Sequence, residues 1–263
     1  MIGAIIGDVV GSRFEWNNHR SRDFELFHAD CRCTDDSILT IAVMKALLES
    51  KADFSDLSEK AVYWVRKIGN LYPDGWYSRR FKAWLTSDDP KPYGAKTNGA
   101  AMRVSACAYA AKDLEEARRL SRAVTEITHN SPEAVKGAEA VTVAVWMARK
   151  GASKAEIRDE IIRNYYPIDF TIDAIRDKYE FDFTSEGSVP HALEAFFESR
   201  DFEDAIRTAV SLGGDSDTIA CIAGAVAGAH FGVPEFMREK TLSCMDDTMK
   251  EIYFAFEEKY CRM

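Results

Sequence analysis

Two acidic clusters about 180 positions apart constrain the fold of this chain most. They are Thr34-Asp35-Asp36 and Asp215-Ser216-Asp217-Thr218, and each lies between a turn and a strongly helical segment. Four carboxylates cannot share a buried cleft unless they bind protons or recruit cations. Mg²⁺, Mn²⁺ and Ca²⁺ accept carboxylate and hydroxyl oxygens, whereas Zn²⁺ prefers His and Cys. The pair of clusters therefore predicts a divalent-cation site where the first and last thirds of the chain meet.

Two helical segments carry a glycine at every fourth position. The two series are Gly3, Gly7, Gly11 and Gly224, Gly228, Gly232. Glycine lowers helix stability, so its repetition on one face indicates that a backbone or a ligand approaches closely. Tight helix packing alone would account for both series. One series surrounds Asp8 and the other follows the second acidic cluster, which favours a common centre for the two ends of the chain.

Apolar residues recur at helical spacing over most of the chain. The segments with this spacing are 37–48, 57–68, 99–111, 114–125, 133–148, 155–164, 189–198, 202–212, 217–229 and 249–259. Ser153 with Glu156 and Thr248 with Glu251 predict capping boxes. Residues 179–183 are the best strand candidate. Because we find no linker or composition break, we expect a single all-α domain over residues 1–263.

Charge and composition exclude several classes of protein. A formal net charge of -9 argues against a sequence-independent nucleic-acid binder, which needs a basic face. Six cysteines are too few and too scattered for a disulfide scaffold. The longest apolar run, 219–229, is too short to cross a bilayer, and we find no signal peptide. We therefore expect a cytoplasmic protein with no nucleic-acid or membrane partner.

Other acidic or metal-binding patterns have simpler interpretations. Asp88-Asp89 precedes a proline and predicts a turn, whereas Asp246-Asp247 precedes a helix and predicts a cap. Capping would also explain either main cluster taken singly. Cys31-Arg32-Cys33 lacks the second Cys/His pair of a zinc site. Asp215 does not begin an EF-hand loop, because Ile219 takes the fifth position of that loop.

Four ordered motifs resemble the ADP-ribosylglycohydrolase family, which includes the dinitrogenase-reductase-activating glycohydrolase. In chain order they are Gly7-Asp8-x-x-Gly11-Ser12-x-Phe14-Glu15, Thr34-Asp35-Asp36-Ser37, Asn98-Gly99-Ala100-Ala101-Met102-Arg103 and Gly213-Gly214-Asp215-Ser216-Asp217-Thr218. The resemblance extends from Ile2 to Gly232. It implies a compact, orthogonal all-α bundle of multiple helices. It also implies two Mg²⁺ ions, or Mn²⁺ ions, between the acidic clusters.

The resemblance gives candidate roles residue by residue. The implied metal ligands are Thr34, Asp35, Asp36, Asp215, Asp217 and Thr218. The candidate catalytic residues are Glu15 and Asp35, and Glu15 matches an acidic residue that lies near the distal ribose in relatives. The candidate substrate-binding residues are Asn98, Gly99, Ala100, Met102, His129 and Ser131. We expect amides at the start of the 99–111 helix to face the diphosphate.

The implied activity is metal-dependent hydrolysis of the glycosidic bond between ADP-ribose and a protein side chain or small-molecule acceptor. Such a bond breaks through an oxocarbenium-like state. The sequence leaves the acceptor open among arginine, serine, O-acyl and other linkages. Two other classes also stay open. One is a non-catalytic ADP-ribose-binding or crystallin-like relative, and the other is a dinuclear-metal phosphoester hydrolase.

Overall fold

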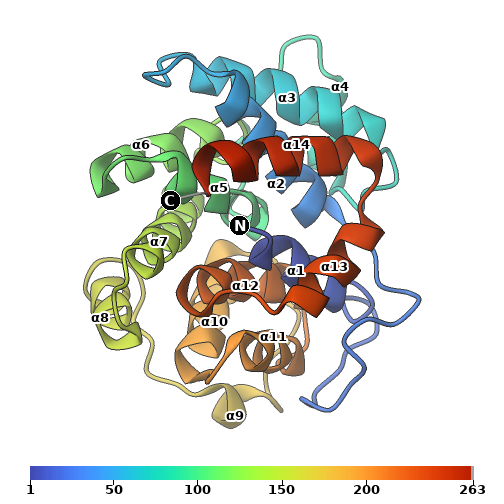
Figure 1. Ribbon diagram of the computed structural model, residues 1–263, viewed down its shortest axis with the longest axis vertical. Coiled ribbons are helices and arrows are strands. Elements are labelled where there is room, and N and C mark those ends of the chain that lie inside the picture. The colour runs from blue at the N-terminus through green and yellow to red at the C-terminus, as the bar shows by residue number, and fades with distance from the viewer. Residues whose placement is uncertain (262–263) are drawn as a thin grey trace.

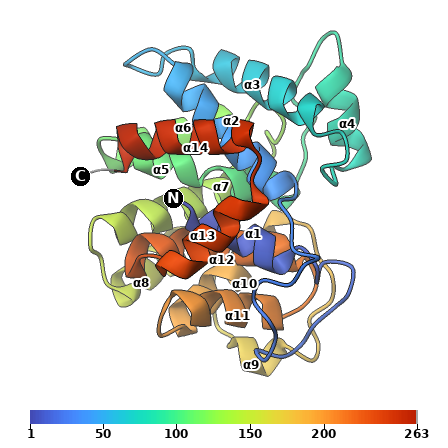
Figure 2. The same ribbon diagram turned by 45° about the vertical axis from the view of Figure 1, so that its right-hand side comes forward.

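Residues 1–261, which the computed structural model describes, form fourteen α-helices and one 3₁₀ helix. Their bounds are α1 (Gly3–Gly11), α2 (Asp35–Glu49), α3 (Leu57–Leu71), α4 (Arg79–Thr86), η1 (Asn98–Arg103), α5 (Ser105–Ala110), α6 (Leu114–Thr125), α7 (Pro132–Arg149), α8 (Lys154–Asn164), α9 (Ile172–Ile175), α10 (Ser185–Glu198), α11 (Phe202–Ser211), α12 (Ser216–Phe231), α13 (Glu235–Cys244) and α14 (Asp247–Tyr260). Figures 1 and 2 show helices that cross in several directions instead of lying side by side. The predicted all-α orthogonal bundle is confirmed.

Helices α1 and α12 pack against each other at the centre of the molecule, and glycines set their distance. A Cβ on Gly7 would lie 2.0 Å from the backbone oxygen of Ala220, and one on Gly3 would lie 2.2 Å from that of Gly224. Ordinary Cβ contacts begin at 3.4 Å, so only glycine allows this approach. The glycine series therefore serve helix packing. Gly232 differs, because it ends α12 with a φ of 79°.

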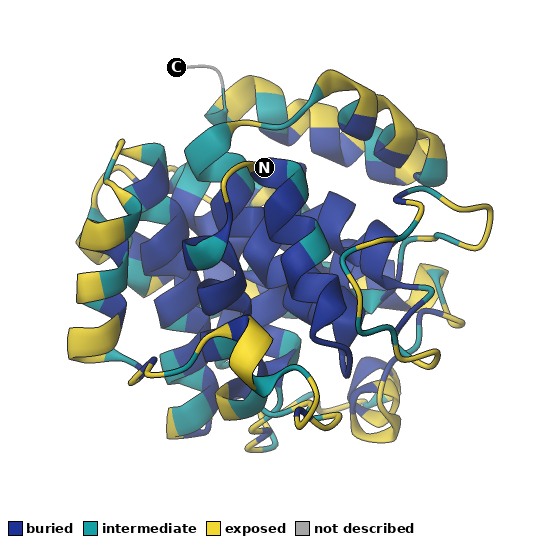
Figure 3. Ribbon diagram, turned by 90° about the horizontal axis from the view of Figure 1, so that it is seen from below, coloured by how far each residue is buried: buried dark blue, intermediate teal, exposed yellow. Residues whose placement is uncertain are grey.

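The remaining helices surround this central pair. Helix α12 also contacts α2, α7, α10 and α11. In Figure 3 the inner helices are buried on all sides, whereas the outer helices expose one face. Buried apolar side chains from Ile2 to Phe256 form one contiguous core. Within residues 1–261, no helix is both long enough and apolar enough to span a bilayer.

The predicted helical segments coincide with observed helices, with one exception. Residues 98–103 form a 3₁₀ helix, and a separate α-helix follows from Ser105 to Ala110. The tighter winding of the first part interrupts the single helix expected over 99–111. Helices α4, α9 and α13 lie outside the predicted segments. The strand predicted at 179–183 is wrong, since the one bridge within residues 1–261 joins Thr97 to Thr184.

Local capping signals gave mixed results. The Ser153 hydroxyl accepts from the Glu156 amide, and the Glu156 carboxylate accepts from the Ser153 amide, so this capping box is confirmed. The box predicted at Thr248 is wrong. Helix α14 starts earlier, and the Asp246 carboxylate accepts from the Met249 amide at 2.9 Å. The alternative prediction of a cap at Asp246-Asp247 is thereby confirmed.

Candidate active site

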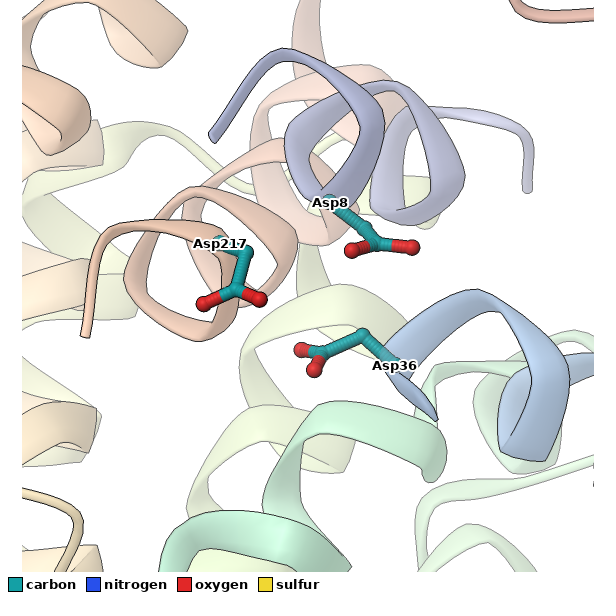
Figure 4. A group of neighbouring side chains, drawn as sticks. All are labelled: Asp8, Asp36 and Asp217. Carbon is teal, nitrogen blue, oxygen red and sulfur yellow. The ribbon is translucent and has the colours of Figure 1, made fainter. Parts of the chain in front are cut away.

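The N-termini of α2 and α12 meet beside the middle of α1. Asp36 belongs to the first turn of α2, Asp217 to the first turn of α12, and Asp8 to α1. Figure 4 shows their three carboxylates pointing toward a common centre. One carboxylate oxygen from each residue lies within 4.8 Å of the others. Glu15, Asp215 and Asp217 form a second group with the same spacing, so Asp217 belongs to both groups.

Asp8 organises the first acidic cluster. Its carboxylate accepts from the Thr34 amide at 2.9 Å and from the Ser37 amide at 3.1 Å, and both hydroxyls also donate to it. Amides at a helix start lack intrahelical partners and favour a negative charge, so Asp8 stabilises the beginning of α2. The sequence prediction omits Asp8. One sequence signal could have identified it as a site residue, because Asp8 is the one charged residue of α1.

Two threonine hydroxyls connect the clusters. Thr34 Oγ1 lies 3.3 Å from Asp217 Oδ2, and Thr218 Oγ1 donates to Asp36 Oδ2 at 3.3 Å. Asp36 Oδ1 is buried and has no hydrogen-bond partner within residues 1–261. A buried polar atom without a partner destabilises a fold. This oxygen is therefore a candidate metal ligand.

The acidic side chains raise one another's pKa. Burial raises the pKa of Asp36 and Asp217 well above the usual value, and neighbouring carboxylates raise it further. Burial, followed by the charges of nearby aspartates, raises the pKa of Glu15 and of Asp35 to about 8. Carboxylate and hydroxyl oxygens suit a hard divalent cation, whose charge favours the ionised carboxylates. The residues present thus fit the cation site that the sequence predicts.

A turn of two glycines positions the second cluster. Gly213 and Gly214 have φ values of 77° and 70°, in the left-handed region that favours glycine. The Gly214 amide donates to Asn18 Oδ1 at 2.9 Å, which ties the loop after α1 to this turn. From the other side, Asn98 Nδ2 donates to Asp215 Oδ2 at 2.6 Å. Asn18 therefore holds the glycine turn and Asn98 holds the Asp215 side chain, from two distant parts of the chain.

A cavity of about 290 Å³ opens beside the acidic groups. Five carboxylate residues line part of it: Glu15, Asp35, Asp36, Asp215 and Asp217. Its other walls carry aromatic side chains, Gly99, Met102 and His129. A concave site with apolar walls and a few converging polar groups suits a small organic ligand.

Comparison with known proteins gives the family. The family model described as ADP-ribosylglycohydrolase matches residues 1–259. The chain belongs to the ADP-ribosylglycohydrolase family. ADP-ribosylarginine hydrolase Tri1 of Pseudomonas putida is 28% identical over 89% of this chain and 70% of its own. ADP-ribosylhydrolase ARH3 of Mus musculus is 24% identical over 93% of this chain and 86% of its own. ADP-ribosyl-[dinitrogen reductase] glycohydrolase of Rhodospirillum rubrum is 27% identical over 77% of this chain and 70% of its own.

A solved structure agrees with the ADP-ribosylglycohydrolase family at the level of the fold. It is described as an ADP-ribosylglycohydrolase-related protein complex, and its TM-score to this chain is 0.69 at 22% identity. The match covers 98% of this chain and 95% of the solved one. The fold predicted from the resemblance is therefore confirmed over nearly the whole length.

Most of the predicted site residues line the cavity of this family member. They are Glu15, Asp35, Asp36, Asn98, Gly99, Met102, His129, Asp215, Asp217 and Thr218. The structure does not bring Ala100 and Ser131 to the cavity. Ala100 is fully buried, and Ser131 caps α7, where its hydroxyl accepts from the Ala134 amide and donates to the Ala95 carbonyl. Thr34 lies among the carboxylates without lining the cavity.

The cavity wall also holds two buried basic side chains. Burial lowers the pKa of His129 well below its usual value, so its ring is neutral at pH 7. The ring nitrogens lie 2.8 Å from Thr97 Oγ1 and 2.7 Å from Thr128 Oγ1. Burial lowers the pKa of Arg103 to about 10, which leaves its guanidinium charged. Arg103 donates to Thr128 Oγ1 at 2.8 Å and is the one Lys or Arg, among the described residues, that lines the cavity.

Proposed function

We propose that this chain hydrolyses the glycosidic bond between ADP-ribose and an acceptor, with the help of divalent cations. The observation that carries the proposal is the convergence of Glu15 and both acidic clusters on one cavity in a member of this family. Relatives are described as hydrolases of ADP-ribosylarginine and of ADP-ribosyl-[dinitrogen reductase], which supports an ADP-ribose conjugate as substrate. The acceptor would be a protein side chain or a small molecule.

The two groups of carboxylates support a site for two cations, with Mg²⁺ as the first candidate and Mn²⁺ as the second. Asp217 belongs to both groups, as a bridging ligand would. We propose Thr34, Asp35, Asp36, Asp215, Asp217 and Thr218 as ligands, with Asp8 as an additional member. Asp35 belongs to neither close group, so it is the weakest member of this set. Bound cations of this kind orient hydroxyl groups and acidify water.

Glu15 is our first candidate for proton transfer. Its carboxyl group lies at the cavity beside Asp215 and Asp217, and one of its oxygens, Oε2, is buried without a hydrogen-bond partner among residues 1–261. Burial, followed by the charges of Asp215 and Asp35, raises its pKa to about 8, so it holds a proton near neutral pH before cations bind. Asp35 is the second candidate, because its pKa is also raised to about 8 and it lines the same cavity.

The ADP part of the substrate is assigned to the wall formed by η1 and His129. Gly99 lies beside the His129 ring there, and a Cβ at this position would be in ordinary contact with His129 Nε2 at 3.4 Å, so only a side chain larger than alanine would fill this part of the wall. The backbone amide and the side chain of Asn98, which we expected to contact the ligand, have partners within the protein instead. The Asn98 amide donates to the Phe183 carbonyl at 2.9 Å, and the Asn98 side chain holds Asp215 and Ser188. We therefore propose Asn98 as a positioning residue for Asp215, and Gly99, Met102 and His129 as the ligand-facing wall.

The test is release of free ADP-ribose from ADP-ribosyl-arginine and ADP-ribosyl-serine peptides, with Mg²⁺ and with EDTA. Wild type should release ADP-ribose only with Mg²⁺. Asp36→Asn and Asp217→Asn should lose most of this activity, whereas Asp88→Asn, a change in an exposed turn, should not. A wild-type protein that binds ADP-ribose but releases none from any conjugate would support the non-catalytic alternative and contradict the proposal.

A further inference from the structure

Four polar side chains at the η1 wall of the cavity are joined by successive hydrogen bonds. Arg103 Nη2 donates to Thr128 Oγ1 at 2.8 Å, and Thr128 Oγ1 lies 2.7 Å from His129 Nδ1. On the other side of the ring, His129 Nε2 lies 2.8 Å from Thr97 Oγ1. We call these four residues the polar network. Its first three members are buried, whereas Thr97 is half-buried and lines the cavity.

The direction of each hydrogen bond in the polar network follows from its buried end. An arginine side chain has only donors, so Thr128 Oγ1 accepts from Arg103. Thr128 is fully buried, and within residues 1–261 its hydroxyl proton has no acceptor other than His129 Nδ1. A buried hydroxyl proton without an acceptor destabilises a fold. Thr128 therefore donates to Nδ1.

This donation determines the tautomer of His129. Because burial lowers the pKa of His129 well below its usual value, its ring is neutral at pH 7 and carries one N–H. Nδ1 accepts from Thr128, so the ring proton lies on Nε2. Nε2 then donates to Thr97 Oγ1, which leaves the Thr97 hydroxyl proton without an acceptor in the part of the chain that the structure describes. That proton is available to a ligand.

Thr97 presents its free donor to the cavity beside Gly99. An atom at the position of a Cβ on Gly99 would lie 3.9 Å from Thr97 Oγ1, so a ligand group seated against Gly99 comes within reach of this hydroxyl. The guanidinium of Arg103 lies at the other end of the polar network. Successive hydrogen bonds polarise one another, and a cation at the start of the series strengthens the last donor. Such a donor suits a negatively charged oxygen.

We propose that the Thr97 hydroxyl donates to a phosphate oxygen of the ligand, and that His129 is the positioning residue that orients this hydroxyl. The inference rests on the glycohydrolase function proposed above, which assigns the ADP part of the substrate to this wall. Both ring nitrogens of His129 are used within the protein. The ring therefore offers the ligand a face instead of a hydrogen bond. Thr97 becomes a ligand-binding residue that the sequence prediction omits.

The experiment compares Thr97→Val, which removes the hydroxyl and keeps the shape, with Thr97→Ser, which keeps the hydroxyl. In calorimetry on the Mg²⁺-loaded protein, Thr97→Val should weaken binding of ADP-ribose about tenfold, as loss of a hydrogen bond to a charged group does. ADP, which lacks the distal ribose, should lose the same factor. KM for an ADP-ribosyl conjugate should rise similarly with kcat unchanged, because the contact is remote from the bond that breaks. Thr97→Ser should bind nearly as the wild type does, and so should Thr248→Val, a matched control at an exposed position on α14.

Nitrogen-15 NMR tests the polar network without a ligand and without activity. At pH 7 the wild-type protein should show His129 with an unprotonated Nδ1 and a protonated Nε2, and the loss of these signals in His129→Gln assigns them. Thr97→Val should keep this tautomer, because Thr128 determines it. A proton on Nδ1 in the wild type would overturn the inference.

The outcomes separate this inference from the function on which it rests. A loss of affinity for both ADP-ribose and ADP in Thr97→Val, but not in Thr97→Ser, supports the phosphate contact. Unchanged affinity in Thr97→Val, an equal loss in Thr97→Ser, or a loss for ADP-ribose alone overturns it and leaves the glycohydrolase function standing. A wild-type protein that shows the expected tautomer but releases no ADP-ribose from any conjugate would instead contradict the proposed function.

Discussion

Replacing Gly11 by alanine should separate the two acidic clusters. Gly11 is the last residue of α1, and it faces the first turn of α12. An added Cβ would lie 2.6 Å from Asp217 Cα, 2.6 Å from the Ser216 carbonyl oxygen and 2.8 Å from the Asp217 amide nitrogen, whereas ordinary contact begins at 3.4 Å. All three are backbone atoms, so no side chain can rotate to relieve the overlap. The start of α12 must move, and Asp217 moves with it.

The expected loss of stability follows from two opposing terms. Overpacking of a close contact costs about 1–3 kcal/mol, and the overlap with backbone places this case near the upper value. Alanine stabilises a helix by up to about 1 kcal/mol relative to glycine, which offsets part of this cost. The net destabilisation is therefore about 2 kcal/mol, which corresponds to a fall in Tm of roughly 4–8 °C for a chain of this size.

Gly69→Ala is the matched control. Gly69 is also a buried glycine in a helix, but its added Cβ would meet Leu85 Cδ2 at 2.8 Å, the end of a flexible side chain. We expect its Tm to stay close to that of the wild type. Thermal unfolding and Mg²⁺ titration calorimetry should then separate the variants, with at least tenfold weaker Mg²⁺ binding in Gly11→Ala alone. If Gly11→Ala unfolds and binds Mg²⁺ as Gly69→Ala does, the close contact of α1 with α12 does not set the site.

Three further predictions concern the site itself. Glu15→Gln should keep its Tm and lose most of kcat toward an ADP-ribosyl conjugate, and unchanged kcat and KM would remove Glu15 from the reaction. In EDTA, Tm should fall as pH rises from about 5 to about 8, because the folded protein keeps protons on Glu15 and Asp35, whose pKa is raised to about 8, after the unfolded chain has released them. Saturating Mg²⁺ should raise Tm and weaken or reverse this dependence on pH, since it binds the ionised carboxylates of the folded state. Scanning calorimetry that shows Tm rising with pH in EDTA would contradict the prediction. Gly99→Val should weaken ADP-ribose binding at least tenfold in calorimetry, because the valine side chain would enter the space beside His129. If the wild-type protein binds ADP-ribose and ribose 5-phosphate with equal affinity, the diphosphate lies elsewhere.

The sequence indicates the helices and the acidic clusters because these are local signals. Apolar spacing identifies long helices such as α2 and α7, but it fails for α9, which has only four residues. The glycine series predicts close packing without naming the partner helix. The packing of α1 on α12 is a tertiary contact, and only the structure shows that Gly3 and Gly224 face each other.

The parts of the site that escaped prediction depend on contacts between distant segments. Asp8 looks like an isolated charge in an apolar helix until the amides of α2 are placed against it. Ser131 precedes a helix, and the structure uses it as the cap of α7. The stacking of Trp16 on Phe181 joins residues that no sequence pattern relates.

The most direct test of the account is the identity of the products formed from an ADP-ribosyl-arginine peptide by the Mg²⁺-loaded protein. Chromatography with mass spectrometry should detect intact ADP-ribose and an unmodified arginine peptide, and EDTA should abolish both. Glycosidic cleavage leaves the diphosphate whole. AMP together with a peptide that retains ribose phosphate would show hydrolysis of the diphosphate bond instead, and would contradict the account.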